Sequence, residues 1–151
     1  MPTASCLCGS CEITISKILS TGICHCATCR KMTSSPISLN AVIPSDSLVL
    51  QSGSPKECRL PSETGADSKF YFCSDCGSAL WTESSEMPGL RVLKAGVLDG
   101  MEALEDVKPK AEQFVTRRPS WLSPISGASQ CEGMQKGVRE ALMKRLHSSR
   151  V

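Results

Sequence analysis

The sequence has few aromatic residues, little net charge and no long apolar run. Aromatic residues make up 4% of the 151 residues, and 17 basic against 15 acidic residues leave a net charge of +2. So small a charge gives no electrostatic reason to expect nucleic acid or an anionic membrane as a partner. The scarcity of aromatic rings also disfavours a surface on which bases stack. No stretch of 18 apolar residues is present, so we expect no membrane-spanning helix.

A secretion signal is also missing from the first residues. The segment MPTASCLCG has neither a basic start nor an apolar stretch. We therefore expect a cytoplasmic protein, in which thiols stay reduced. In that setting we expect the ten cysteines of the chain to be reduced thiols or metal ligands rather than disulfides.

Short strands account for most of the predicted structure, and the length fits a single core. In the segment CEITISKI, Cys11, Ile13 and Ile15 alternate with polar residues, as in a half-buried strand. The same interpretation predicts strands at 37–43, 47–51, 69–73, 79–83 and 90–96, with turn residues between them. Six short strands favour a mainly β fold of small antiparallel sheets.

The C-terminal part predicts a loop followed by a helix. Residues 117–135 are rich in proline, glycine and serine but include Trp121, so we interpret them as an ordered return loop. Beyond them, Val138, Leu142 and Leu146 recur at helical spacing.

This spacing predicts a short helix over 136–147, with a basic solvated face and an exposed His147. We accordingly divide the chain into a cysteine-rich domain at 1–135 and a helical extension at 136–151.

Two pairs of cysteines, CxCG and CxxCG, suit a closed metal site. On an extended chain the side chains of Cys6 and Cys8 point the same way. A tight turn can bring Cys73 and Cys76 together, because the glycine after each pair, Gly77 here, tolerates positive φ. Four thiolates match the tetrahedral coordination of structural zinc, so the spacing predicts a structural zinc on these four cysteines.

The segment ICHCATCR crowds three more cysteines together, and we predict that they hold a second, catalytic zinc. Cys24, Cys26 and Cys29 supply three thiolates, while alternation directs His25 away from its neighbours. Three protein ligands leave a fourth position for substrate, as in catalytic zinc sites. Because zinc has no redox chemistry, the expected reaction is polar.

Three thiolates on Zn²⁺ leave a formal charge of about −1, which suits a soft sulfur ligand better than a potent hydroxide. Arg30 and Lys31 follow directly and are interpreted as compensation for that charge or as anchors for a substrate carboxylate. The alternative is two exposed basic residues at the start of a short helix.

Other uses of the three-cysteine cluster stay open at this point. A fourth thiolate from Cys11, Cys58 or Cys131 would close the site and make it structural, and an iron–sulfur centre would need the same addition. A redox pair at Cys26 and Cys29 lacks the usual βαβ surroundings. A metal carrier that releases its ion is a further alternative.

The order of these motifs resembles one known family. The segments CLCGSCEITI, CHCATCRK, FYFCSDCGSALW and LKAGVLD follow one another as in the glutathione-dependent formaldehyde-activating enzymes, also called the CENP-V/GFA domain. The resemblance covers nearly all of residues 5–135. It implies an Mss4-like β fold organised around zinc.

The resemblance also implies the two zinc sites and an activity. That activity is carbon–sulfur bond formation or cleavage between glutathione and formaldehyde, giving S-(hydroxymethyl)glutathione. Two departures bear on the substrate: Ser34 stands where many members have glycine, and Glu112 where others often have histidine. Two alternative functions stay open. In these alternatives the protein is either a related enzyme that acts on a different sulfur-containing biosynthetic intermediate or a non-catalytic, zinc-stabilised binding module.

Glutathione would need cations for its two carboxylates. Arg30 and Lys31 are nearest to the three cysteines in sequence, and the other candidates are Lys69, Arg91, Arg117 and Arg118. Trp81 and Trp121 could line the pocket but are interpreted as core residues.

Overall fold

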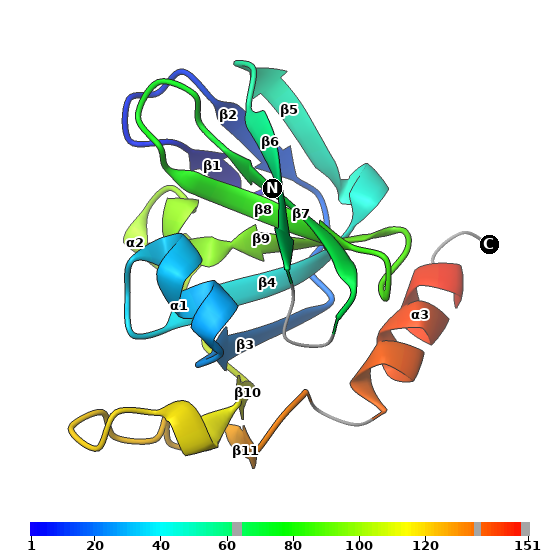
Figure 1. Ribbon diagram of the computed structural model, residues 1–151. Coiled ribbons are helices and arrows are strands. Elements are labelled where there is room, and N and C mark those ends of the chain that lie inside the picture. Colours follow the sequence, from blue (N-terminus) through cyan, green and yellow to red (C-terminus); the bar gives the residue numbers. More distant parts are fainter. Residues whose placement is uncertain (62–64, 135–136, 149–151) are drawn as a thin grey trace.

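Two β-sheets form the body of the protein (Figure 1). The computed structural model describes residues 1–61, 65–134 and 137–148. The smaller sheet is antiparallel and has the strand order β1–β2–β5, with the bounds Thr3–Ser5, Glu12–Ile15 and Leu48–Ser52.

The larger sheet has eight strands in the order β11–β10–β3–β4–β9–β8–β7–β6. Their bounds in chain order are Ser20–Cys24 (β3), Ser38–Pro44 (β4), Lys56–Pro61 (β6), Asp67–Phe72 (β7), Ala79–Ser84 (β8), Leu90–Lys94 (β9), Ala111–Gln113 (β10) and Ser129–Cys131 (β11). The helices are α1 (Ala27–Thr33), α2 (Met101–Asp106) and α3 (Val138–Ser148), with 3₁₀ turns at Ser45–Ser47, Ala95–Val97 and Val115–Arg117.

The predicted fold class is confirmed: the protein is mainly β and ends in a short helix. The six predicted strands correspond to β2, β4, β5, β7, β8 and β9, and the predicted helix corresponds to α3. The boundary proposed between residues 135 and 136 lies outside the described residues and stays a prediction. None of the helices in the described ranges is long and apolar enough to cross a bilayer.

The sequence pattern did not predict β1, β3, β6, β10, β11 or α2. Strand β10 has only three residues and pairs in parallel with both β3 and β11, so the larger sheet is not wholly antiparallel. Three residues are too few to show a period of two, and such a strand is held by neighbours that are distant in sequence. The return loop does rejoin the sheet, through β11.

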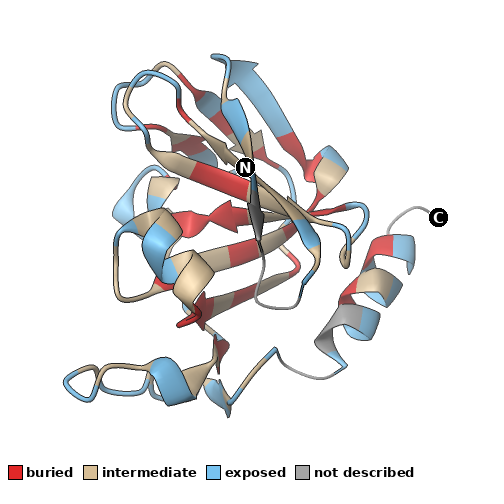
Figure 2. Ribbon diagram, in the orientation of Figure 1, coloured by how far each residue is buried: buried red, intermediate tan, exposed pale blue. Residues whose placement is uncertain are grey.

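The hydrophobic core lies between the two sheets. Ile13 and Ile15 of β2 pack in one cluster with Ile43 of β4, Leu80 of β8 and Leu93 of β9. These five side chains are at most 1% exposed. In Figure 2 the buried residues are accordingly concentrated in the central strands of the larger sheet.

The opposite face of the larger sheet is left for a cavity. Successive side chains of a strand point to opposite faces. Leu93 of β9 is therefore in the core, while its neighbours Val92 and Lys94 line the cavity. Helix α3 packs near the edge of this face, where Leu142 and Leu146 form a second buried cluster with Leu19 and Leu90.

The two tryptophans differ in burial. Trp81 is 5% exposed and stacks on Tyr71 with ring centroids 4.7 Å apart, so its interpretation as a core residue is confirmed. Trp121 is 72% exposed, so the same interpretation of Trp121 is wrong. It lies in the loop between β10 and β11, which projects from the sheet in Figure 1 and offers a large ring no core to enter.

Helix α1 ends in a strained residue. Its C-cap, Ser34, has φ 52° and ψ 32°, the left-handed conformation in which glycine is preferred. The departure from glycine at this position therefore concerns the backbone, and Ser34 does not line the cavity.

We expect Ser34→Gly to raise the free energy of unfolding by about 1 kcal/mol, because an L-residue pays roughly 1–2 kcal/mol for this conformation and glycine does not. Urea unfolding followed by circular dichroism measures the change. Ser34→Ala keeps the Cβ atom and should bring no gain. Equal stability of the two variants would contradict this account.

Candidate metal centres

Two turns bring four distant cysteines into one cluster. Cys6 and Cys8 lie between β1 and β2, and Cys73 and Cys76 lie between β7 and β8. All four Sγ atoms are within 4.8 Å of one another. The Sγ–Sγ distances are 3.5 Å for Cys6 and Cys8 and 3.8 Å for Cys8 and Cys73. Two sulfurs bound tetrahedrally to zinc would be about 3.8 Å apart, so the four side chains fit such an ion.

The glycine that follows each pair has the expected conformation. Gly9 has φ 77° and Gly77 has φ 75°. In the second turn, the N–H of Gly77 donates to the carbonyl of Cys73 over 2.9 Å, which closes the loop around the two sulfurs. Hydrogen bonds from the Ser78 hydroxyl and backbone, and from the backbone of Cys8, lower the pKa of Cys76 to about 5. These hydrogen bonds therefore favour the thiolate form of Cys76, which is the form that a metal requires.

The second cluster combines the end of a strand with the start of a helix. Cys24 is the last residue of β3, Cys26 is the N-cap of α1, and Cys29 lies in the first turn of that helix. The N–H of Cys29 donates to Cys26 Sγ over 3.3 Å, which fixes the two sulfurs relative to each other. The three Sγ atoms are within 4.8 Å of one another and could hold a metal ion.

No fourth side chain joins this cluster within the described ranges, which contain all ten cysteines. The scattered residues Cys11, Cys58 and Cys131 lie outside it. The arrangement therefore differs from the four-cysteine cluster in leaving a position that the chain itself does not occupy.

His25 points away from the three sulfurs, as alternation predicts. It is 1% exposed, and its Nε2 lies 3.8 Å from Oε1 of Glu112. The other carboxylate oxygen of Glu112, Oε2, accepts from Arg118 Nη1 over 2.7 Å. Burial lowers the pKa of His25. Neither His25 nor Glu112 lines the cavity, so the glutamate that departs from the family pattern belongs to the support of the cysteine loop.

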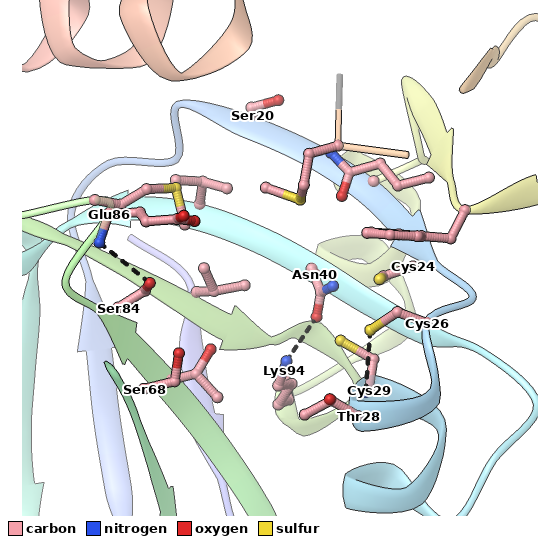
Figure 3. A pocket seen from close by; sticks show the side chains of 18 of the residues that line it. Ser20, Cys24, Cys26, Thr28, Cys29, Asn40, Ser68, Ser84, Glu86 and Lys94 are labelled. Carbon is pink, nitrogen blue, oxygen red and sulfur yellow. Dashed lines mark hydrogen bonds between the residues drawn. The ribbon is translucent and has the colours of Figure 1, made fainter. Parts of the chain in front are cut away.

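A cavity of about 190 Å³ opens beside the three cysteines. One end is formed by the three sulfurs with Asn40 and Lys94, and the opposite side carries Ser68, Ser84 and Glu86 (Figure 3). Val42 and Val92 lie between these polar groups, and Leu142 of α3 completes part of the wall. The site is therefore polar at both ends and apolar in the middle.

Asn40 and Lys94 are residues beside the three sulfurs that the sequence analysis missed, as it missed Ser68, Ser84 and Glu86 on the opposite side. Lys94 is 4% exposed, and its Nζ donates to Asn40 Oδ1 over 3.0 Å. Hydrogen bonds from Cys24 and Cys26, the charge of Lys94 and a hydrogen bond from Asn40 lower the pKa of Cys29. One signal was available: Leu90, Val92 and Lys94 share one face of this strand by their period of two, and Lys94 is the charged residue among them.

The structure also ranks the basic residues proposed as carboxylate partners. Of Lys69, Arg91, Arg117 and Arg118, only Lys69 lines the cavity. Arg91 instead pairs with Glu83 over 2.8 Å.

Arg30 and Lys31 are exposed in the last turn of α1 and are not among the lining residues, so their role as anchors stays a prediction. Neither Trp81 nor Trp121 lines the cavity.

Residues 1–117 match the family described as glutathione-dependent formaldehyde-activating enzyme. The chain belongs to this family. Among curated proteins, none matches the chain. A crystal structure of a Rhodobacter sphaeroides protein, a structural genomics target, has a TM-score of 0.56 and 19% identity over 71% of this chain and 96% of its own. At that identity the likeness supports the fold alone.

We expect the purified protein to carry two zinc ions and the two clusters to respond differently to mutation. Cys73→Ala should lower the zinc content and unfold the domain, because the four-cysteine cluster ties together segments about 65 residues apart. Cys29→Ala should remove one zinc with the fold retained. Elemental analysis and circular dichroism measure both effects.

Cys58→Ala is the matched control, since this cysteine lies outside both clusters. Unfolding of the Cys29→Ala protein to the same extent as Cys73→Ala would show that the two clusters do not divide their roles in this way.

Proposed function

We propose that the protein is a zinc-dependent carbon–sulfur lyase that joins a thiol such as glutathione to an aldehyde such as formaldehyde, and cleaves the adduct in reverse. The observation that carries this proposal is the three-cysteine cluster at the end of a cavity. A family named for this activity supports it. We assign the structural zinc to Cys6, Cys8, Cys73 and Cys76 and the catalytic zinc to Cys24, Cys26 and Cys29.

The donor set fits the proposed chemistry. Zinc bound by three thiolates supplies a soft Lewis acid with one position left for a substrate sulfur in its thiolate form. The residues that line the cavity would bind the remainder of the thiol substrate, limit the access of water and align the substrate sulfur with the aldehyde carbon. Such positioning alone can contribute several kcal/mol to catalysis.

The far end of the cavity suits the charged groups of glutathione. Glu86 offers an anion for the ammonium group and Ser68 and Ser84 add hydroxyl groups, while Lys69 borders this end and is the cation that we propose for a carboxylate. The side chain of Lys69 is 35% exposed and pairs with Glu57 over 3.3 Å on the face of β7 opposite to Ser68, so it would have to leave Glu57 to bind the substrate. The zinc and this end of the cavity would thus hold the thiol at two points.

We expect the wild-type protein to accelerate exchange between ¹³C-formaldehyde and S-(hydroxymethyl)glutathione, measured by exchange NMR against the spontaneous rate. Cys29→Ala should reduce the exchange to that spontaneous rate, because the fold remains but the second zinc is lost. Cys58→Ala should keep wild-type activity. A folded, two-zinc protein that leaves the spontaneous rate unchanged would overturn the proposal for this pair of substrates.

Lys69→Ala tests how the thiol is held. It should raise KM for glutathione about tenfold, which corresponds to the loss of one charge-assisted hydrogen bond, and change kcat little. The same substitution at Arg30 distinguishes the two proposed anchors. If Arg30→Ala raises KM and Lys69→Ala does not, the carboxylate partner lies on α1 instead of at the far end of the cavity.

A further inference from the structure

A buried lysine lies next to the three cysteines, where burial of its charge is energetically unfavourable. Lys94 is 4% exposed at the end of β9. Burying an ammonium group is unfavourable unless its charge and N–H donors find partners. Within the described residues, the structure gives this ammonium group one acceptor, Asn40 Oδ1 at 3.0 Å. An ammonium group has three N–H donors, so two of them are left for a ligand.

Asn40 holds this lysine in a defined position. Asn40 and Lys94 are directly opposite each other in the register of β4 and β9. The amide oxygen of Asn40 also accepts from the Ser38 hydroxyl over 2.8 Å, so it is fixed by two donors. Asn40 and Lys94 line the cavity together with Cys24, Cys26 and Cys29, which places the lysine beside the cysteine cluster. Figure 3 shows Asn40 and Lys94 between the sulfurs and the rest of the cavity.

We propose that Lys94 and Asn40 form an oxygen-binding subsite for the aldehyde, with Lys94 Nζ donating to the carbonyl oxygen. This inference rests on the proposed function, which assigns no residue to that oxygen. The subsite suits a small aldehyde, because its carbonyl group would lie between the cysteine cluster and Lys94. The carbon would then face the thiol sulfur held at the cluster, and the oxygen would face the lysine. Lys94 touches the reacting oxygen and is therefore a catalytic residue in this assignment.

The bond changes show why a cation is useful at this point. A sulfur lone pair of the thiolate forms the new S–C bond, and the π pair of the C=O bond moves to the oxygen. That oxygen gains negative charge and takes up one proton from solvent, which replaces the proton that the thiol released to solvent on becoming a thiolate. The thiol and the aldehyde together thus give the S-hydroxymethyl product with no net gain or loss of protons. A fixed donor binds the charged oxygen more strongly than the neutral carbonyl, so Lys94 lowers the barrier in both directions.

Lys94→Met tests this assignment, since it keeps the length of the side chain and removes the charge and the donors. We expect kcat for the exchange reaction to fall 10²- to 10³-fold, the usual loss when one donor to a developing oxyanion is removed. The zinc content should stay at two per chain, and KM for glutathione should change less than threefold. Lys94→Arg should recover part of kcat, and Lys56→Met, at an exposed lysine of β6, should behave as wild type.

A second readout does not depend on turnover. S-acetylglutathione carries a carbonyl next to its sulfur, and its C=O stretching frequency reports hydrogen bonding to that oxygen. In the zinc-loaded protein we expect the frequency to be lower for wild type than for Lys94→Met. An identical frequency in the two proteins would show that Lys94 does not bind the oxygen.

Two outcomes separate a structural role from the proposed one. Loss of zinc or a raised KM for glutathione in Lys94→Met, with kcat unchanged, would make the lysine a counter-charge for the cluster and overturn the proposal. If Lys94→Met does not fold, Lys94→Gln keeps a neutral donor and should lose about tenfold in kcat; a folded Lys94→Gln protein with wild-type kcat also overturns it. An inactive wild type overturns the proposed function itself.

Discussion

Successive side chains of a strand point to opposite faces of a sheet, and in β4 and β9 this alternation separates the hydrocarbon core from the cavity. Ala41 and Leu93 pack into the core, while Asn40 and Lys94, one residue away in each strand, line the cavity. A shift of register by one residue would exchange the two sets. The site is therefore built on the strands that hold the core together.

The two cysteine clusters use this scaffold in different ways. The four-cysteine cluster joins the turn before β2 to the turn before β8, so it constrains segments that are distant in sequence. The three-cysteine cluster spans only the junction of β3 and α1 and lies at the end of the cavity. A closed set of ligands suits a structural ion and an incomplete set suits exchange with a substrate. The fold thus supplies one cluster suited to a metal cross-link and one suited to the proposed reaction.

The polar groups around the three cysteines come from several strands. Behind the cysteine loop, His25 and Glu112 are buried together and Arg118 closes the group from the loop after β10. In front of it, Asn40 and Lys94 face the cavity. Glu112 reaches its place because β10 pairs in parallel with β3. The short strand that had no sequence signal is therefore the one that supports the metal-binding loop.

The sequence by itself determined the mainly β class, the membership of both cysteine clusters that could hold a metal ion and the orientation of His25. These follow from local rules: alternation along a strand, cysteine spacing and the preference of Gly77 for positive φ. Only the tertiary structure decided that Lys69 rather than Arg91 lines the cavity, that Trp121 is exposed and that Lys94 is buried beside the sulfurs. Such facts depend on pairing between distant strands, which no local pattern encodes.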